Sequence, residues 1–181
     1  CVVSDGARPG SVFAPMHWNE EFASKARIGS AIEARVDPVS GQPALKHSAV
    51  SLSRYPAAWY GFAVSRERPE LALADYVVAA RTEGGWRSEL ADTASCDPTA
   101  LMRRLCGMEV DTPLTEYHDR ASGTHRFAAF EGERLLAALW VAPSPITVSR
   151  SFAAAQLAAE QITPSDRLRL LAGRPGAGRP D

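Results

Sequence analysis

A histidine and a tryptophan, His17 and Trp18, are neighbours in the sequence whose side chains could bind a ligand. Tryptophan offers a flat apolar surface with one hydrogen-bond donor, and histidine donates or accepts at either ring nitrogen. Together they suit a heteroaromatic ligand. A core tryptophan with a supporting histidine gives the same pattern, so the residue types alone leave both interpretations open.

A lysine interrupts the apolar face of a strand that the sequence predicts over Ala44–Ser53. With the two-residue period of a strand, Lys46 shares a face with Val50 and Leu52. A fixed anionic partner such as a phosphate would explain a lysine there. A lysine near the start of the strand, with its ammonium extended into water, would explain it too, and spacing alone favours this second explanation.

The remaining candidate ligands and nucleophiles are scattered. His118 and His125 fall on neighbouring predicted strands and could face each other, but no third metal ligand lies at short spacing, so ordinary surface positions are favoured over a metal site. Cys1, Cys96 and Cys106 form no CxxC pair, which argues against a zinc site, a disulfide framework or a self-contained iron–sulfur cluster. We interpret Cys96 and Cys106 as structural.

Nucleotide-binding glycine loops and hydrolase motifs are absent from the sequence.

Composition excludes several classes of protein. The chain has 181 residues, 45% of them hydrophobic, and a formal net charge of -1. That is enough for one ordinary core or two small ones, without the basic field that holds a nucleic-acid backbone. The apolar runs are too short to span a bilayer. No nucleic acid and no membrane is therefore expected as a partner.

Turn and cap residues divide the chain into elements. Residues 1–52 look mostly like strand and loop, with a helical turn expected over Asn19–Arg27 and a dense turn over Asp37–Pro43. Later strands are expected over Trp59–Val64, Thr115–Asp119, Thr124–Phe130 and Arg134–Val141, the last three forming a meander. Helices are expected over Pro69–Ala80 (ended by Gly84-Gly85), Pro98–Cys106, Ser149–Gln161 and Pro164–Ala172.

The ends of the sequence suggest a piece of a longer chain. There is no initiator methionine and no signal peptide, and Gly173–Asp181 reads as a Gly/Pro/Arg linker. We therefore expect a fragment that continues in both directions.

Two strings of residues resemble a known family. Pro9-Gly10-Ser11-Val12-Phe13-Ala14-Pro15-Met16-His17-Trp18 and, further on, Asp37-Pro38-Val39-Ser40-Gly41-Gln42-Pro43-Ala44-Leu45-Lys46 are similar to the C-terminal molybdopterin-dinucleotide-binding region of bacterial assimilatory nitrate reductases. These enzymes belong to the dimethyl-sulfoxide-reductase group of molybdenum oxidoreductases. The resemblance extends loosely to Leu170–Pro175.

The resemblance implies a fold and a cofactor. The fold is expected to be α+β, with a partial double-psi β-barrel over residues 1–52, an α+β accessory region over 53–172 and a linker over 173–181. The cofactor is expected to be bis(molybdopterin guanine dinucleotide) molybdenum, bound through His17, Trp18, Gly29, Ser30 and Lys46. The family often carries an asparagine near the position of Gly29; here Ser30 or the Gly29 backbone would replace it.

The resemblance also implies a function. The whole enzyme would reduce nitrate to nitrite in the cytoplasm, with its iron–sulfur clusters outside this chain and electrons from a flavoprotein or ferredoxin. The rest of the same polypeptide, with upstream catalytic domains and a downstream iron–sulfur domain, would be its main partner. Two alternatives stay open: another substrate in the same family, as in formate dehydrogenases and other oxyanion reductases, and a non-catalytic module that docks a redox partner. In either case the incomplete barrel should expose apolar surface.

Overall fold

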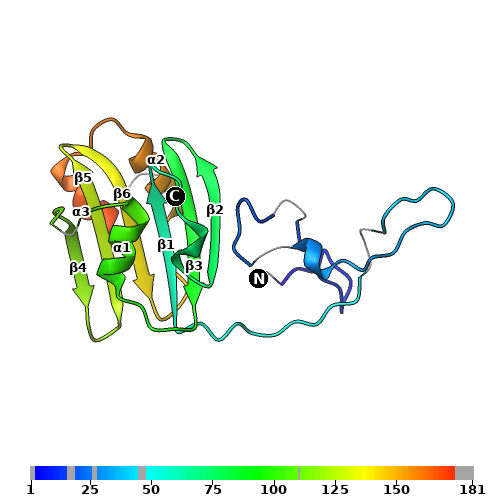
Figure 1. The fold of residues 1–181 in the computed structure, drawn as a ribbon. Coiled ribbons are helices and arrows are strands. Elements are labelled where there is room, and N and C mark those ends of the chain that lie inside the picture. Colours follow the sequence, from blue (N-terminus) through cyan, green and yellow to red (C-terminus); the bar gives the residue numbers. More distant parts are fainter. Residues whose placement is uncertain (1–2, 16–18, 26–27, 45–47, 110, 174–181) are drawn as a thin grey trace.

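The computed structural model describes residues 3–15, 19–25, 28–44, 48–109 and 111–173 (Figure 1). Its regular elements are concentrated after residue 58. Strand β1 (Trp59–Ser65) lies near the middle of a six-stranded antiparallel sheet with the order β2-β3-β1-β6-β5-β4. The other strands are β2 (Tyr76–Thr82), β3 (Gly85–Asp92), β4 (Thr115–Asp119), β5 (Thr124–Glu131) and β6 (Arg134–Ala142).

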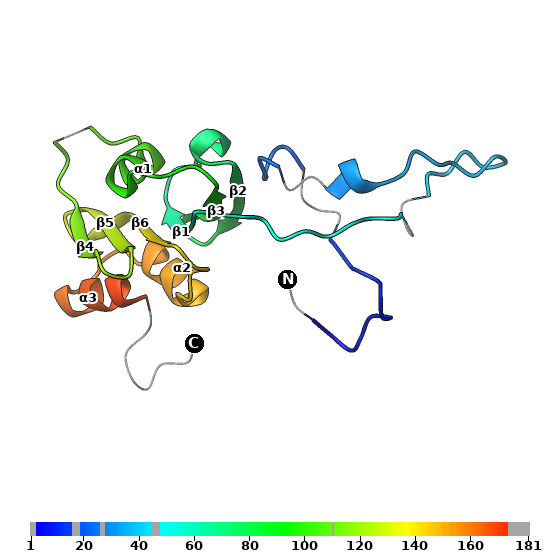
Figure 2. The ribbon, with the colours of Figure 1, turned by 90° about the horizontal axis from the view of Figure 1, so that it is seen from below.

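Helices cover both faces of this sheet. Helix α1 (Pro98–Cys106) and the short 3-10 turn η2 (Leu71–Leu73) lie on one face, and α2 (Arg150–Ala158) and α3 (Pro164–Ala172) lie on the other. Figure 2 shows α1 on one side of the strands and α2 and α3 on the opposite side. Because both faces are buried, the central strands consist of nearly continuous apolar runs, such as Phe62-Ala63-Val64 in β1.

Two hydrophobic cores result. On the α1 face, Met102 and Leu105 of the helix pack against Phe127 and Leu139 of the sheet. On the other face, Leu157 of α2 and Leu170 of α3 pack against Phe62 and Trp140, whose rings stack at 5.5 Å between centroids. Both cores lie within residues 59–173, so this part of the chain contains the apolar material that a stable sheet needs.

The helix ends follow the capping residues of the sequence. Asp97 accepts hydrogen bonds from the backbone N–H of Thr99 and Ala100 and begins α1, and Gly107 ends it in the left-handed conformation. Thr163 caps α3 through the N–H of Asp166, and Gly173 ends it in the same way. The predictions for Pro98–Cys106 and Pro164–Ala172 are confirmed, as are those for β1, β4, β5 and β6. Helix α2 is shorter than the predicted Ser149–Gln161.

The helix predicted over Pro69–Ala80 is wrong. After the short turn η2 the chain forms strand β2, and Gly84-Gly85 make the turn into β3 instead of ending a helix. Val77 and Ala79 are buried on one face of β2, while the alternating residues Tyr76 and Val78 are only partly covered. This two-residue alternation, together with adjacent β-branched valines, favours a strand, and a proline followed by a glutamate does not outweigh it.

The first part of the chain contains little regular structure. Its described residues up to 52 form the 3-10 turn η1 (Ile28–Ala31) and two single bridges, Ala23 with Val78 and Val36 with Pro43. The expected helix over Asn19–Arg27 is reduced to one turn, in which the N–H of Ala23 bonds the carbonyl of Asn19 at 2.9 Å; residues 26–27 lie outside the described residues.

The strand expected over Ala44–Ser53 is not formed in its described part. Within the described parts of the chain, no strand pairs with the backbone N–H and C=O groups of residues 48–53. The partial barrel over 1–52 therefore stays a prediction. The α+β class is confirmed by the mixed sheet and helices of the later region.

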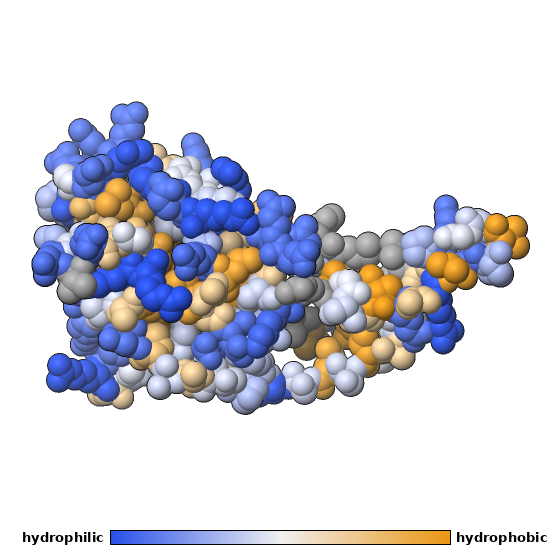
Figure 3. Space-filling model, viewed as in Figure 1, coloured by the Kyte–Doolittle hydropathy of each residue, from blue (hydrophilic) through white to orange (hydrophobic). Residues whose placement is uncertain are grey.

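Large apolar side chains of the first part are exposed to solvent. Figure 3 shows such residues at the surface of the N-terminal extension. Those exposed before residue 53 are Val3, Val12, Phe13, Val36, Val39, Val50 and Leu52. Apolar exposure on this scale is typical of a surface that another polypeptide segment covers. Among the described residues, no helix is both long and apolar enough to cross a membrane.

Candidate functional site

Gly29 and Ser30, two of the predicted cofactor-binding residues, lie in η1. The backbone turns tightly here, with the N–H of Ile32 bonded to the carbonyl of Gly29 at 3.3 Å. Apart from Gly29 itself and the backbone next to it in the chain, no atom of the described residues lies within 4 Å of the position that a Cβ on Gly29 would take. The Gly29 backbone therefore faces open space, where a bound group could approach it closely.

A hairpin-like excursion follows η1. The N–H of Ala44 bonds the carbonyl of Arg35 at 2.8 Å, and the N–H of Asp37 bonds the carbonyl of Gln42 at 2.8 Å. At its tip, the Asp37 carboxylate accepts from the N–H of Ser40 at 2.7 Å and from the Ser40 hydroxyl at 3.0 Å. These bonds lower the pKa of Asp37 below its ordinary value. The dense turn predicted over Asp37–Pro43 is confirmed.

The excursion returns to the end of η1. The Ser48 hydroxyl accepts a hydrogen bond from the N–H of Glu33 at 3.1 Å. The structure thus brings Ser48 beside the stretch that contains Gly29 and Ser30. The other three predicted site residues, His17, Trp18 and Lys46, lie outside the described residues.

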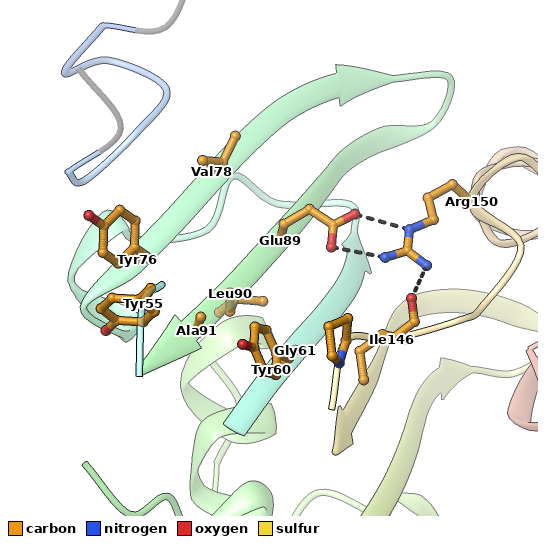
Figure 4. A pocket seen from close by; sticks show the side chains of 11 residues that line it. Tyr55, Tyr60, Gly61, Tyr76, Val78, Glu89, Leu90, Ala91, Ile146 and Arg150 are labelled. Carbon is orange, nitrogen blue, oxygen red and sulfur yellow. Dashed lines mark hydrogen bonds and ion pairs between the residues drawn. The ribbon is translucent and has the colours of Figure 1, made fainter. Parts of the chain in front are cut away.

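A hollow of about 390 Å³ lies on the α2 face of the sheet, beside the start of α2 (Figure 4). Its walls come from β1, β2, β3, the chain before β1 and the loop before α2, and they are mostly apolar. The residues around it include Tyr55, Tyr60, Tyr76, Val78, Pro145 and Ile146. The sequence did not indicate this hollow, because its tyrosines come from separate elements with no regular spacing.

An ion pair closes one side of the hollow. Arg150 at the start of α2 donates two hydrogen bonds to the Glu89 carboxylate of β3, each at 3.0 Å. The same guanidinium donates to the carbonyls of Ile146 and Val148 at 2.7 Å and lies over the ring of Phe62. Because Arg150 already has these partners, its role is to hold the loop before α2 against the sheet.

His118 and His125 face each other across β4 and β5. Their Nδ1 atoms are 2.8 Å apart, and Nε2 of His118 is 2.9 Å from Oε2 of Glu116. Burial and the nearby His118 lower the pKa of His125. Within the described part of the chain, no three histidine, cysteine or acidic side chains gather where they could hold a metal ion.

The two described cysteines have no partner for a disulfide. Burial raises the pKa of the Cys96 thiol to about 11 and that of Cys106 to about 12. Both pack against the core on the α1 face. Thiols that stay protonated in an apolar setting are poor nucleophiles, which agrees with their interpretation as structural residues.

Comparison with known proteins gives independent information on the first part of the chain. Residues 1–49 match the family model described as the molydopterin dinucleotide binding domain. The chain is 46% identical over 66 residues to a nitrate reductase of Klebsiella oxytoca, and 35% identical over 60 residues to a nitrate reductase of Shewanella frigidimarina. These matches cover 36% and 33% of this chain.

The chain spans only a small part of these relatives, since the matches cover 8% and 6% of their lengths. No solved structure matches the chain. The comparisons therefore support a relationship between the first part of this chain and molybdenum oxidoreductases.

Proposed function

We propose that this chain is the molybdopterin-dinucleotide-binding region from the C-terminal part of a molybdenum-dependent nitrate reductase. The observation that carries the proposal is the family match over residues 1–49. The same stretch exposes large apolar side chains and contains little regular structure, whereas the hydrophobic cores lie after residue 58. A segment of this kind suits a role in which the cofactor and further polypeptide complete its packing.

The described residues fit such a cofactor. The open space at Gly29 allows the backbone to approach a bound group, and Ser30 lies next to it in η1. His17, Trp18, Gly29, Ser30 and Lys46 would hold the cofactor, which we propose is the guanine dinucleotide form, present as a pair around molybdenum. When bound, it supplies the oxygen-atom transfer that reduces nitrate to nitrite.

Each of these residues has a distinct binding task. The Lys46 ammonium is a compact charge suited to phosphate oxygens. The Trp18 ring offers an apolar surface to a pterin, and His17 can donate or accept a hydrogen bond at its polar edge. Gly29 contributes close backbone approach, and Ser30 contributes a hydroxyl.

The proposal extends to the rest of the enzyme. We infer an assimilatory, cytoplasmic nitrate reductase whose iron–sulfur clusters lie in other parts of the polypeptide and whose electrons come from a flavoprotein or a ferredoxin. The isolated chain, without those parts, is then inactive. The names of the two relatives favour nitrate over formate or another oxyanion.

Replacement of Lys46 by alanine in the full-length enzyme tests the proposal. Loss of one charge-assisted contact, about 1.5–3 kcal/mol, should lower the molybdenum content and the amount of guanine nucleotide released on hydrolysis. Arg120→Ala, an exposed arginine between β4 and β5, is the control and should leave both unchanged.

Two results would contradict the proposal. A purified full-length protein without molybdenum or pterin would exclude cofactor binding. A molybdenum-containing protein that oxidises formate and does not reduce nitrate would keep the family and exclude the substrate.

A further inference from the structure

The Asp75 carboxylate lies between the two ends of the segment 26–54. Its Oδ1 accepts a hydrogen bond and ion pair from Nζ of Lys25 at 2.5 Å, and its Oδ2 accepts from the Tyr55 hydroxyl at 3.2 Å. Lys25 comes directly before the segment and Tyr55 directly after it. One carboxylate therefore holds both ends of a stretch that contains Gly29, Ser30 and Lys46.

Asp75 is itself fixed to the sheet. It lies directly before β2, and its N–H donates to the Asp92 carboxylate at the end of β3 at 2.9 Å. Tyr55 is also supported, because its ring meets that of Tyr76 edge to face at 4.6 Å (Figure 4). The backbone of Asp75 is thus fixed to the sheet, and its carboxylate reaches the segment from the edge of β2.

The residues before Lys25 pair with the edge of β2. The N–H of Ser24 bonds the carbonyl of Val77 at 2.9 Å, and the N–H of Ala79 bonds the carbonyl of Phe22 at 2.8 Å. The Ser24 hydroxyl accepts from the N–H of Val77 and donates to the carbonyl of Asp75. The first part of the chain thereby extends the sheet by a short strand-like contact.

Side chains seal this contact. Phe22 lies 6.5 Å from the ring of Trp86, which is buried and lies beneath the guanidinium groups of Arg68 and Arg81. Arg68 also donates a hydrogen bond to the carbonyl of Glu21. Backbone pairing, aromatic packing and the ion pair all hold the same short segment against the sheet.

We propose that the β2 edge is the docking surface for the cofactor-binding segment, with Asp75 as its positioning residue. This inference rests on the proposed function. A loop with free ends loses more conformational entropy on binding a ligand than one whose ends are already held together. The sheet of residues 59–173 therefore serves to preorganise the segment that touches the cofactor.

The test uses the full-length enzyme with Asp75→Ala, Asp75→Asn and Tyr55→Phe. Asp119→Asn is the matched control, because Asp119 also accepts several hydrogen bonds but is the last residue of β4, at the opposite edge of the sheet. One readout is the rate at which molybdopterin leaves the enzyme in dilute denaturant. The other is hydrogen–deuterium exchange of peptides from residues 19–35 and 48–57, measured on both the cofactor-loaded and the cofactor-free enzyme.

Both Asp75 variants should release the cofactor about two- to fivefold faster than the control, the range that exposed ion pairs and single hydrogen bonds support. Exchange in the two peptides should rise, and β5 and β6 should stay protected. Tyr55→Phe should affect mainly the 48–57 peptide. The double variant Lys25→Asp, Asp75→Lys restores an ion pair and should recover part of the protection.

Each outcome separates the two proposals. Unchanged exchange and unchanged release in Asp75→Ala would overturn the positioning role while leaving cofactor binding intact. A wild-type enzyme without molybdopterin would overturn the proposed function, and the exchange measurement would still decide whether Asp75 holds the segment. If Asp119→Asn had an equal effect, Asp75 would contribute only to the general stability of the protein, and its positioning role would be excluded.

Discussion

At the scale of single residues, His125 of β5 makes stability depend on pH. Burial, followed by the charge of His118, lowers the pKa of His125. The folded protein thus prefers the neutral imidazole more strongly than the unfolded chain does. At pH values well above the pKa of His125 in the unfolded chain, the folded and unfolded states both carry the neutral imidazole. His125 therefore adds no pH dependence to the free energy of unfolding there.

The expected result is a loss of stability on mild acidification. The pKa of His125 is about 6.5 in the unfolded chain and lower in the folded protein. As the pH falls through this range, the unfolded chain takes up the proton first, so the free energy of unfolding decreases. Urea unfolding at several pH values between about 7.5 and 5.5 measures how the free energy of unfolding changes with pH. Most aspartates do not titrate in this pH range. His125→Gln should weaken this pH dependence; an unchanged dependence in that variant would assign the effect to other groups.

Single residues were also where the sequence was least informative. Asp75 joins Lys25 and Tyr55 although it lies 50 residues from one and 20 from the other. Nothing in its local pattern distinguishes it from a solvent-exposed aspartate before a strand. Such a role depends on tertiary contacts, and only the assembled β2 edge reveals it.

At the scale of elements, the turn between β2 and β3 depends on a glycine. Gly84 has a φ of +81°, and a Cβ there would lie 2.7 Å from Cα of Ala158 and 2.9 Å from the carbonyl oxygen of Leu157. Both atoms belong to the backbone at the end of α2, which cannot move as a flexible side chain would. Conformation and space both exclude a side chain.

Gly84→Ala should therefore destabilise the protein by about 3 kcal/mol or more, from left-handed strain and the clash with α2 together. Gly132 in the β5–β6 turn is a matched control, because its φ is +59° and nothing lies within 4 Å of its would-be Cβ. Gly132→Ala should cost only about 1–2 kcal/mol, the strain alone. Equal losses in chemical denaturation would contradict the packing of α2 against this turn.

Element prediction succeeded where local signals agree with tertiary demands. Asp97, Pro98 and Gly107 define α1 through bonds within a few residues, so the sequence predicts its bounds. It fails over Tyr76–Thr82, because Pro69 and Glu70 predict a helix start, whereas the alternation that favours a strand is short and its partner β3 lies later in the chain. The prediction for residues 48–53 also fails. Their alternation predicts a strand, but no described neighbouring strand pairs with them.

At the scale of the whole molecule, the distribution of apolar residues divides the chain. Residues 59–173 bury their large apolar side chains in two cores, whereas the part before residue 53 exposes many of its own. The contact at β2 covers only a short stretch of that first part. The sheet should consequently fold by itself, and the first part should require further polypeptide.

Removal of residues 1–54 tests this division. The shortened protein should unfold cooperatively in denaturant, bind less of a dye specific for exposed apolar surface, and stay in solution at higher concentration than the 181-residue chain. Compared with a Trp18→Phe variant of the 181-residue chain, which contains the same three tryptophans, its fluorescence should shift to the red, because Phe22 no longer covers Trp86. Phe22→Ala in the intact chain should reproduce that shift without the gain in solubility. If the shortened protein instead lost its cooperative transition, the sheet would depend on the first part for folding, and the two hydrophobic cores would not suffice to stabilise it.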